Sequence, residues 1–202
     1  MNKPANGYEE FAADFLRVRG NTADRGMGVE QVRDWARRLP ERATVLDLGC
    51  GSGLPLTKVL LEEGHAVFGV DASPTLVAAF RRHLPGVPVA CEPVETSAFH
   101  QQRYDGVLAW GFIFLLPIGT QLTTLRHIAR VLVPGGRLLF TAPAPCCTWR
   151  DALTGEESNS LGAVTYRKQL EESGVMVVRE YEDEGENHYF EAIRQVPPSL
   201  EG

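Results

Sequence analysis

The apolar positions of this chain follow two patterns that alternate along most of its length. Short β-branched and leucine-rich runs predict buried strands, and apolar residues three and four positions apart predict helices. The first strand begins at Thr44 and ends in Asp47, and the later strands are expected at residues 66–71, 87–91, 104–110 and 137–142. The intervening helices are expected at residues 56–63, 74–84 and 120–132. This alternation predicts a parallel, doubly wound α/β sheet with helices on both faces.

Both ends of the chain depart from this alternation. Residues 8–18 and 29–39 carry apolar side chains at helical spacing, with a loop from Arg19 to Thr22 between them. A long polar loop is expected at residues 143–162, followed by a helix at 163–173. Two more strands, 175–181 and 188–194, are joined by so short a link that they can only form an antiparallel hairpin. The tail, residues 197–202, is expected to fray.

A glycine motif follows the first strand and points to a ligand site. It reads Asp47-Leu48-Gly49-Cys50-Gly51-Ser52-Gly53 and leads directly into a helix. Strand, glycine loop and helix open a nucleotide-binding α/β unit, because only glycine lets a ligand lie against the backbone. The dinucleotide fingerprint would need its third glycine where Leu54 stands. Asp71 ends the second strand about twenty residues later, where such sites place an acid on ribose hydroxyls.

The spacing Asp47-x-Gly49-x-Gly51-x-Gly53 resembles motif I of the class I S-adenosylmethionine-dependent methyltransferases, of the small-molecule type. The run Tyr104-Asp105-Gly106-Val107 resembles the Phe-Asp-x-Val segment of that family, and residues 132–136 resemble its Leu-x-Pro-Gly-Gly turn. The terminal hairpin also fits this family and not a dinucleotide-binding Rossmann fold. The resemblance covers roughly residues 40–195. It implies a Rossmann-like sheet of seven strands in the order 3-2-1-4-5-7-6, with strand 7 antiparallel.

The resemblance also implies how the chain is organised. All 202 residues form one methyltransferase domain. A helical N-terminal extension at residues 1–43 precedes a cofactor-binding half at residues 44–142. Residues 143–196 then supply the substrate side, with a loop, a helix and the terminal hairpin.

The family pattern assigns the cofactor, S-adenosylmethionine, to residues at the carboxyl ends of the strands. Asp71 would bind both ribose hydroxyls, Glu92 would lie near the adenine amine, and Val94 would offer backbone to the ring. The usual Gly-Asp-Ala of the adenine motif is replaced here by Cys91-Glu92-Pro93. Trp110 can shelter the sulfonium through cation–π attraction, or simply fill the core. The full predicted set is Asp47, Gly49, Cys50, Gly51, Gly53, Asp71, Ala72, Glu92, Pro93, Val94 and Trp110.

The methyl acceptor is expected at the same edge of the sheet, where open α/β sheets bind their ligands. The turn of the terminal hairpin and the loop after the fifth strand both reach that edge. The substrate candidates are Phe112, Trp149, Tyr166, Glu186 and Asn187. His188 can take a proton from an acceptor and is the catalytic candidate. Alternatively, the acidic turn only keeps the hairpin soluble, and Phe112 only fills core.

Other residues leave alternatives open. Tyr8, Arg17 and Arg19 lie where an N-terminal helix can close over the cofactor, and an arginine there can pair with its carboxylate. The adjacent Cys146 and Cys147 suggest a thiol pair for arsenite or a metal, but adjacent cysteines chelate poorly. We therefore expect these two thiols to be buried as small apolar residues, and we expect no metal site.

The composition bears on the partners and the cellular location that we expect for this protein. The formal charge of −6 argues against a nucleic-acid partner, since phosphate contacts require a basic surface. The longest uncharged run, residues 106–125, is too polar to span a bilayer, and residues 1–20 have no apolar secretory segment. The four cysteines form no C-x-x-C pair, so reduced thiols in a cytoplasmic protein are expected. A monomer or homodimer is expected.

The sequence thus predicts a methyltransferase that acts on an O, N or S atom of a small molecule. The fourth strand ends without an Asn-Pro-Pro-Tyr-like motif of amide or base methylation. Two other functions stay open. One is a non-catalytic protein that binds S-adenosylmethionine, and the other is an NAD-dependent oxidoreductase, which Leu54 at the third-glycine position disfavours.

Overall fold

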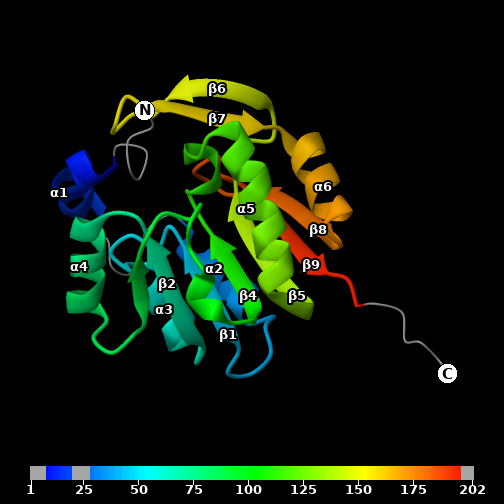
Figure 1. Cartoon of the computed structure of the whole chain (residues 1–202), viewed down its shortest axis with the longest axis horizontal. Coiled ribbons are helices and arrows are strands. Elements are labelled where there is room, and N and C mark those ends of the chain that lie inside the picture. Colours follow the sequence, from blue (N-terminus) through cyan, green and yellow to red (C-terminus); the bar gives the residue numbers. More distant parts are fainter. Residues whose placement is uncertain (1–7, 20–27, 197–202) are drawn as a thin grey trace.

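The computed structural model describes residues 8–19 and 28–196, and a seven-stranded sheet forms its centre (Figure 1). The strands lie in the order β3-β2-β1-β4-β5-β9-β8. Their bounds are β1 Thr44–Leu48, β2 Ala66–Asp71, β3 Val89–Cys91, β4 Tyr104–Ala109, β5 Leu132–Thr141, β8 Val175–Glu182 and β9 His188–Arg194. The first five strands in this order, from β3 across to β5, pair in parallel. Strand β9 is antiparallel to both of its neighbours, β5 and β8. The predicted strand order, with its antiparallel strand, is confirmed.

Helices cover both faces of this sheet because the central strands are apolar on both sides. In β1, Val45 points to one face and Leu46 to the other, and both are fully buried. Helices α2 (Val29–Ala36) and α3 (Leu56–Glu62) pack on the first face. Helices α5 (Ile118–Val131) and α6 (Ala163–Glu172) pack on the second.

Helix α4 (Pro74–His83) follows β2 and begins as its sequence predicts. Ser73 is the N-cap, and its Oγ accepts a hydrogen bond from the N–H of Leu76 at 3.1 Å. Pro74 takes the first helical position, where the missing N–H has no cost. This start fixes the chain direction immediately after Asp71.

The predicted loop at residues 143–162 is wrong. The structure has an antiparallel hairpin there, β6 (Cys146–Arg150) and β7 (Glu157–Leu161), which forms a separate two-stranded sheet. Figure 1 shows it lying across one end of the molecule, with α1 (Tyr8–Arg19) nearby. Strand β7 packs on the short helix η3 (Ile113–Leu115), and the residues of β6 are mostly exposed. The hairpin therefore lacks the apolar alternation that marks a strand in the sequence.

Two predicted strands have different bounds. The strand β3 covers only Val89–Cys91 and not residues 87–91. The strand β5 begins at Leu132 instead of Arg137, because the chain becomes extended directly after α5. Its Pro134-Gly135-Gly136 segment lies where the pairing with β4 shifts register. The family-like turn is therefore an irregular start of the strand.

A buried ion cluster joins the N-terminal part to the C-terminal hairpin. Glu191 on β9 is only 2% exposed. Its carboxylate accepts hydrogen bonds from Arg38, just after α2, at 2.9 and 3.2 Å, and from Arg137 on β5 at 3.1 Å. Two guanidinium groups thus pair with one buried carboxylate, which meets the requirement that a buried charge be paired.

Some expectations fall outside the described residues. They are the loop at residues 20–22, the side chain of Arg19 and the tail at residues 197–202. Within the described ranges, no helix is long and apolar enough to cross a membrane.

Candidate functional site

The glycine loop lies at the carboxyl end of β1 and needs glycine at each motif position. Gly49, Gly51 and Gly53 have φ values of +68°, +55° and +79°, which L side chains rarely adopt. A Cβ at Gly49 would lie 2.7 Å from the Phe112 ring. A Cβ at Gly53 would lie 2.6 Å from Leu84, at the end of α4. Among the described residues, a Cβ at Gly51 would meet only the Phe15 ring of α1, at 3.6 Å. Gly51 is therefore the motif glycine with the most open surroundings.

Asp71 closes this loop from the neighbouring strand. Its Oδ2 accepts a hydrogen bond from the N–H of Gly51 at 2.9 Å, and its Oδ1 accepts one from the N–H of Ser73 at 2.8 Å. Burial raises the pKa of Asp71, although these two hydrogen bonds act in the opposite direction. Ala72, the next residue along the chain, is half-buried. Two predicted cofactor residues, Gly51 and Asp71, are thus in direct contact.

Asp47, in β1 just before the glycine loop, anchors the start of the loop to α3. It is 4% exposed, and its Oδ2 accepts a 2.6 Å hydrogen bond from the hydroxyl of Thr57 in α3. Burial raises the pKa of Asp47 to about 7, because the Thr57 hydrogen bond offsets only part of the desolvation. Cys50 is half-buried, with its Sγ beside Gly69 of β2, and burial raises the pKa of its thiol. Both side chains point into the protein.

The segment that follows β3, where the adenine contacts are predicted, does not contact the glycine loop through any of the hydrogen bonds described above. Glu92 lies at the end of β3, and its Oε1 accepts a 2.7 Å hydrogen bond from Ser97. Pro93 is exposed, and the Val94 side chain is buried among core residues. These positions stay predictions for the adenine contacts.

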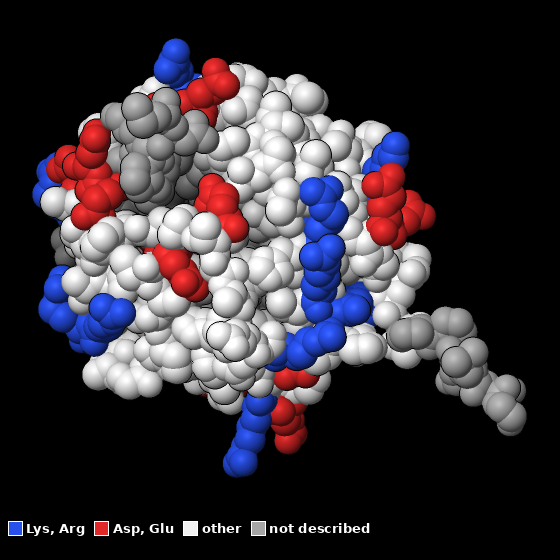
Figure 2. Space-filling view, in the orientation of Figure 1, with Lys and Arg blue, Asp and Glu red and all other residues white. Residues whose placement is uncertain are grey.

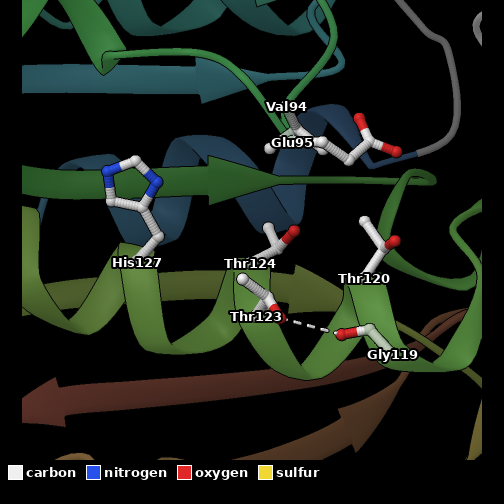
Figure 3. A pocket seen from close by; sticks show the side chains of 7 residues that line it. All are labelled: Val94, Glu95, Gly119, Thr120, Thr123, Thr124 and His127. Atoms are coloured by element: carbon white, nitrogen blue, oxygen red, sulfur yellow. Dashed lines mark hydrogen bonds between the residues drawn. The ribbon is translucent and has the colours of Figure 1, made fainter.

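A pocket of about 220 Å³ lies on the outer side of Val94, against α5 (Figure 3). Glu95, Thr120 and His127 are among the side chains that line it. The His127 ring stacks on Phe99 with centroids 4.1 Å apart, and burial lowers its pKa. Of the predicted cofactor residues, this pocket reaches Val94 alone. It is therefore separate from the glycine loop.

Trp110 and Phe112 follow β4 at the same edge of the sheet. The Phe112 ring covers Gly49, and the Trp110 indole lies against Gly28, where a Cβ would be 2.6 Å from its Nε1. Trp110 donates a hydrogen bond from Nε1 to the hydroxyl of Tyr189 at 2.9 Å. The Gly111 N–H donates to Thr141 at 2.8 Å. These contacts fix the chain beside the glycine loop.

The turn between β8 and β9 reaches this edge as predicted, since Thr141 at the end of β5 pairs with Tyr189. Asp183 organises the turn by accepting hydrogen bonds from the N–H groups of Gly185 and Asn187, from the Asn187 side chain and from the Tyr189 hydroxyl. Burial acts to raise the pKa of Asp183, but these hydrogen bonds outweigh it and lower the pKa. Glu186 is exposed at the turn, with φ +60°.

His188 points to the α6 side of the sheet and lies between two carboxylates. Its Nε2 is 3.1 Å from Glu180 Oε2, and its Nδ1 is 3.4 Å from Glu182 Oε1. The side chain is 12% exposed and packs edge-on against Phe190. The ring is thus held in one orientation, and its catalytic role stays a prediction.

Helix α1 bridges the glycine loop and the β6–β7 hairpin. Glu9 accepts hydrogen bonds from Ser73 and from Thr75, the latter at 2.7 Å, and they lower the pKa of its carboxyl. At the other side, the Tyr8 hydroxyl donates to Asp151 at 3.1 Å. Arg17 instead pairs with Asp14 on the helix surface. Sequence reasoning missed Glu9, because its partners lie 64 and 66 residues away.

The remaining candidates separate into surface and core. Trp149 is half-buried, with its ring 5.3 Å from Phe114. Tyr166 is fully buried on the sheet face, and its hydroxyl donates to Gln121 at 2.7 Å, so its contact with the substrate stays a prediction. Cys146 and Cys147 are exposed on β6, and the expectation that they are buried is wrong because little packs on this two-stranded sheet. All four cysteines are free thiols.

Comparison with known families supports the same region. Residues 45–136 match the model of a methyltransferase domain. The chain is 35% identical over 111 residues to a ubiquinone biosynthesis O-methyltransferase of Xanthomonas axonopodis, covering 52% of this chain and 45% of that protein. It is 31% identical over 117 residues to a tRNA U34 carboxymethyltransferase of Saccharophagus degradans, covering 52% and 35%. The matches span less than half the length of these relatives.

The fold comparison extends over nearly the whole chain. A 1,6-didemethyltoxoflavin-N1-methyltransferase of Burkholderia thailandensis, solved with bound 1,6-didemethyltoxoflavin and S-adenosylhomocysteine, superposes with a TM-score of 0.70. The two are 20% identical, and the match covers 96% of this chain and 92% of the other. The methyltransferase domain and this shared fold agree with the motifs at the sheet edge. Residues 45–136 of this chain thus match a methyltransferase domain, and the chain has the fold of the solved methyltransferases.

Proposed function

We propose that this protein transfers a methyl group from S-adenosylmethionine to an O, N or S atom of a small molecule. The observation that carries the proposal is the contact between Asp71 and the N–H of Gly51 at 2.9 Å. It joins the glycine motif to the acid of the next strand. A carboxylate can accept about four hydrogen bonds, so Asp71 keeps capacity for two ligand hydroxyls beside the two N–H groups it holds.

The other residues of this edge fit a nucleoside cofactor. The open side of Gly51 lets a ligand approach the backbone, and Glu92 lies one strand away from Asp71, at the end of β3. S-adenosylmethionine supplies a methyl group on a positively charged sulfur. For such an in-line displacement, positioning and exclusion of water supply most of the rate. Phe112 and Trp110 provide apolar surface beside the loop.

A small-molecule acceptor is supported by the charge of −6, which disfavours a phosphate backbone. It is also supported by the similarity to a ubiquinone biosynthesis O-methyltransferase and to the fold of a 1,6-didemethyltoxoflavin-N1-methyltransferase. The similarity to a tRNA carboxymethyltransferase favours a second candidate, a tRNA substrate. The two acceptor classes can be separated directly, because tRNA binding would weaken steeply with salt.

The test is a calorimetric titration of the protein with S-adenosylhomocysteine, and with NAD as control. We expect micromolar binding of S-adenosylhomocysteine and none of NAD. Binding of NAD would contradict the assignment and favour the oxidoreductase. Binding of neither ligand would show that the glycine loop is not a cofactor site. Incubation of the enzyme with S-adenosylmethionine and a pool of small aromatic acceptors, or with tRNA, then reports turnover as S-adenosylhomocysteine released. Binding without release from any pool would identify a non-catalytic binding protein.

A further inference from the structure

The pocket between α5 and the segment after β3 has room for a ligand of its own. Its volume is about 220 Å³, whereas one water takes up about 30 Å³ in the liquid, so it is larger than a hydration site. One wall is a single face of α5, formed by residues three and four positions apart: Thr120, Thr123, Thr124 and His127. Val94 and Glu95 form the opposite wall.

Thr124 brings a hydroxyl without a partner to this pocket. The residue is only 3% exposed, and its Oγ makes no hydrogen bond with any described residue. Threonines in helices often donate to the carbonyl one turn earlier, as Thr123 does to Gly119 at 3.0 Å. Figure 3 shows the Thr124 side chain pointing from α5 toward Val94 and Glu95. Because a buried hydroxyl without a partner is unfavourable, its position at the pocket points to a ligand.

His127 adds both a donor and an acceptor. Its ring is held in place by the stack on Phe99, with an angle of 18° between the two planes. Burial, and to a smaller extent the charge of Arg130, lowers the pKa of His127, so the imidazole is mainly neutral at pH 7. A neutral imidazole has one donor and one acceptor nitrogen. Within the described part of the chain, neither nitrogen makes a hydrogen bond, so both are available to a ligand.

The first turn of α5 supplies backbone donors at the other end of the pocket. The helix has 14 residues, and its N-cap is Pro117, so no side chain caps it. Gly119 and Thr120 both line the pocket. Their N–H groups belong to the first turn, where backbone donors have no partner inside the helix. The pocket thus combines backbone donors with hydroxyl and imidazole groups.

Charges of both signs surround the pocket. Glu95 is exposed, and its carboxylate forms no ion pair with a residue that the structure describes. On the helix side, Arg126 donates to the Thr123 hydroxyl at 3.1 Å, and the charge of Arg130 acts on His127. Figure 2 shows the same mixture on this face, with a column of basic side chains on the α5 side and acidic side chains toward α1. Mixed charges of this kind select neither a cation nor an anion.

We propose that this pocket is a second ligand site, and that its ligand is a neutral, hydroxyl-rich molecule of the size of a monosaccharide. Each sugar hydroxyl both donates and accepts, so it can bond to Thr124, to His127 and to the first turn of α5. The C–H groups of a sugar ring can pack on Val94. The ligand is not the methyl acceptor, because an acceptor must touch the transferred methyl group, and the pocket is separate from the glycine loop.

The first test is a titration of the full chain with glucose, followed by the NMR signals of the backbone amides. A ligand of this size is expected to bind with a dissociation constant in the millimolar range. The signals that shift should be those of the pocket residues Val94, Glu95, Gly119 and Thr120. No shift at about 50 mM glucose, or shifts confined to the glycine loop, would overturn the proposal. No cofactor is added, so this result is independent of the methyltransferase function.

The second test compares two threonines that are each 3% exposed. Thr124→Val removes a hydroxyl without a partner, so the thermal midpoint should stay unchanged or rise, while the dissociation constant of glucose should rise about fivefold. Thr141→Val removes the acceptor of the Gly111 N–H and should lower the midpoint by a few degrees without changing glucose binding. His127→Phe keeps a ring that can stack on Phe99 but lacks the ring nitrogens, and it should also weaken glucose binding about fivefold. Unchanged glucose binding in Thr124→Val and His127→Phe would overturn the proposal.

The third test measures the charge preference with three sugars of the same ring type, the neutral glucose, the cationic glucosamine and the anionic glucuronate. Glucose should bind at least as tightly as the other two, because a charged group must leave water without meeting a dominant opposite charge. Tighter binding of glucosamine would show that Glu95 dominates the pocket. Tighter binding of glucuronate would show that the helix start and the arginines dominate it. Either result would overturn the neutral ligand class.

Discussion

Asp71, at the end of β2, and Asp183, in the β8–β9 turn, both hold a loop in place by accepting backbone N–H groups. They differ in what else they bond. Within residues 8–19 and 28–196, Asp71 accepts only from Gly51 and Ser73, and burial raises its pKa. Asp183 accepts from its own turn and from Tyr189, and these hydrogen bonds lower its pKa. One carboxylate keeps free accepting positions and suits a ligand, whereas the other is filled by the protein and stabilises structure.

The largest effect is expected where a side chain enters the open space at Gly51. Gly51→Val should abolish S-adenosylhomocysteine binding in calorimetry. The φ of +55° at Gly51 will lower its stability, but the protein should still fold, because among the described residues a Cβ there meets only Phe15, at 3.6 Å. Gly53→Val is the control. It should destabilise the protein by about 1–3 kcal/mol through overpacking against Leu84 and Phe80, as followed by urea unfolding. Normal binding by folded Gly51→Val would show that the ligand does not approach this glycine.

A second prediction concerns the cost of burying Asp47. Its pKa is about 7 in the folded protein, so between pH 4 and 7 the native state binds more protons than the unfolded state and stability falls as pH rises. Asp47→Asn removes this cost. The variant should match the wild type near pH 4 and exceed it by on the order of 3 kcal/mol above pH 7, measured by denaturant unfolding. A constant difference at all pH values would exclude the raised pKa.

The comparison of the two aspartates can be tested directly. Asp71→Ala should weaken S-adenosylhomocysteine binding by about 1–3 kcal/mol, through loss of charge-assisted hydrogen bonds, as measured by calorimetry. Asp183→Ala should leave that affinity unchanged and instead lower the free energy of unfolding, since Tyr189 and the turn lose their acceptor. Equal losses of cofactor affinity in both variants would show that the two carboxylates do not differ in ligand binding.

The smallest effect is expected at His188. His188→Ala should leave the affinity for S-adenosylhomocysteine unchanged and lower the turnover rate. The decrease should be smaller than the decrease caused by replacing a cofactor-binding residue such as Asp71. The ring is held near Glu180 and Glu182, so a proton taken from an acceptor has carboxylates close by. Turnover is followed as S-adenosylhomocysteine released from S-adenosylmethionine. Turnover equal to that of the wild type would make His188 a structural residue of the hairpin.

The sheet could be predicted from the sequence because its central strands are buried on both faces. Runs such as Val45-Leu46 therefore read as strands without any tertiary information. The β6–β7 hairpin could not, because its serine-rich strand buries hydroxyls instead of apolar groups. Its inner residues, such as Ser158, have the composition of a loop.

The candidate site also has one part that the sequence predicts and another part that it does not. The glycine motif and Asp71 are recognisable because their spacing along the chain is fixed by one βαβ unit. The surroundings of a side chain are not encoded locally. Tyr166 carries an aromatic ring and a hydroxyl, which are common in ligand sites. The packing of α6 nevertheless places it in the core beside Phe140. Glu9 reaches Ser73 only because α1 lies against α4.

The ion cluster at Glu191 has a consequence for how the chain acquires its structure during synthesis. Arg38 leaves the ribosome 153 residues before Glu191, and Arg137 leaves 54 residues before it. Until β9 emerges, both guanidinium groups lack their shared carboxylate and the far edge of the sheet is open. Contacts of such high sequence separation form late and slowly. Nascent chains that stall before β9 therefore present an unpaired β5 edge, and this interval is when the protein depends most on protection from aggregation.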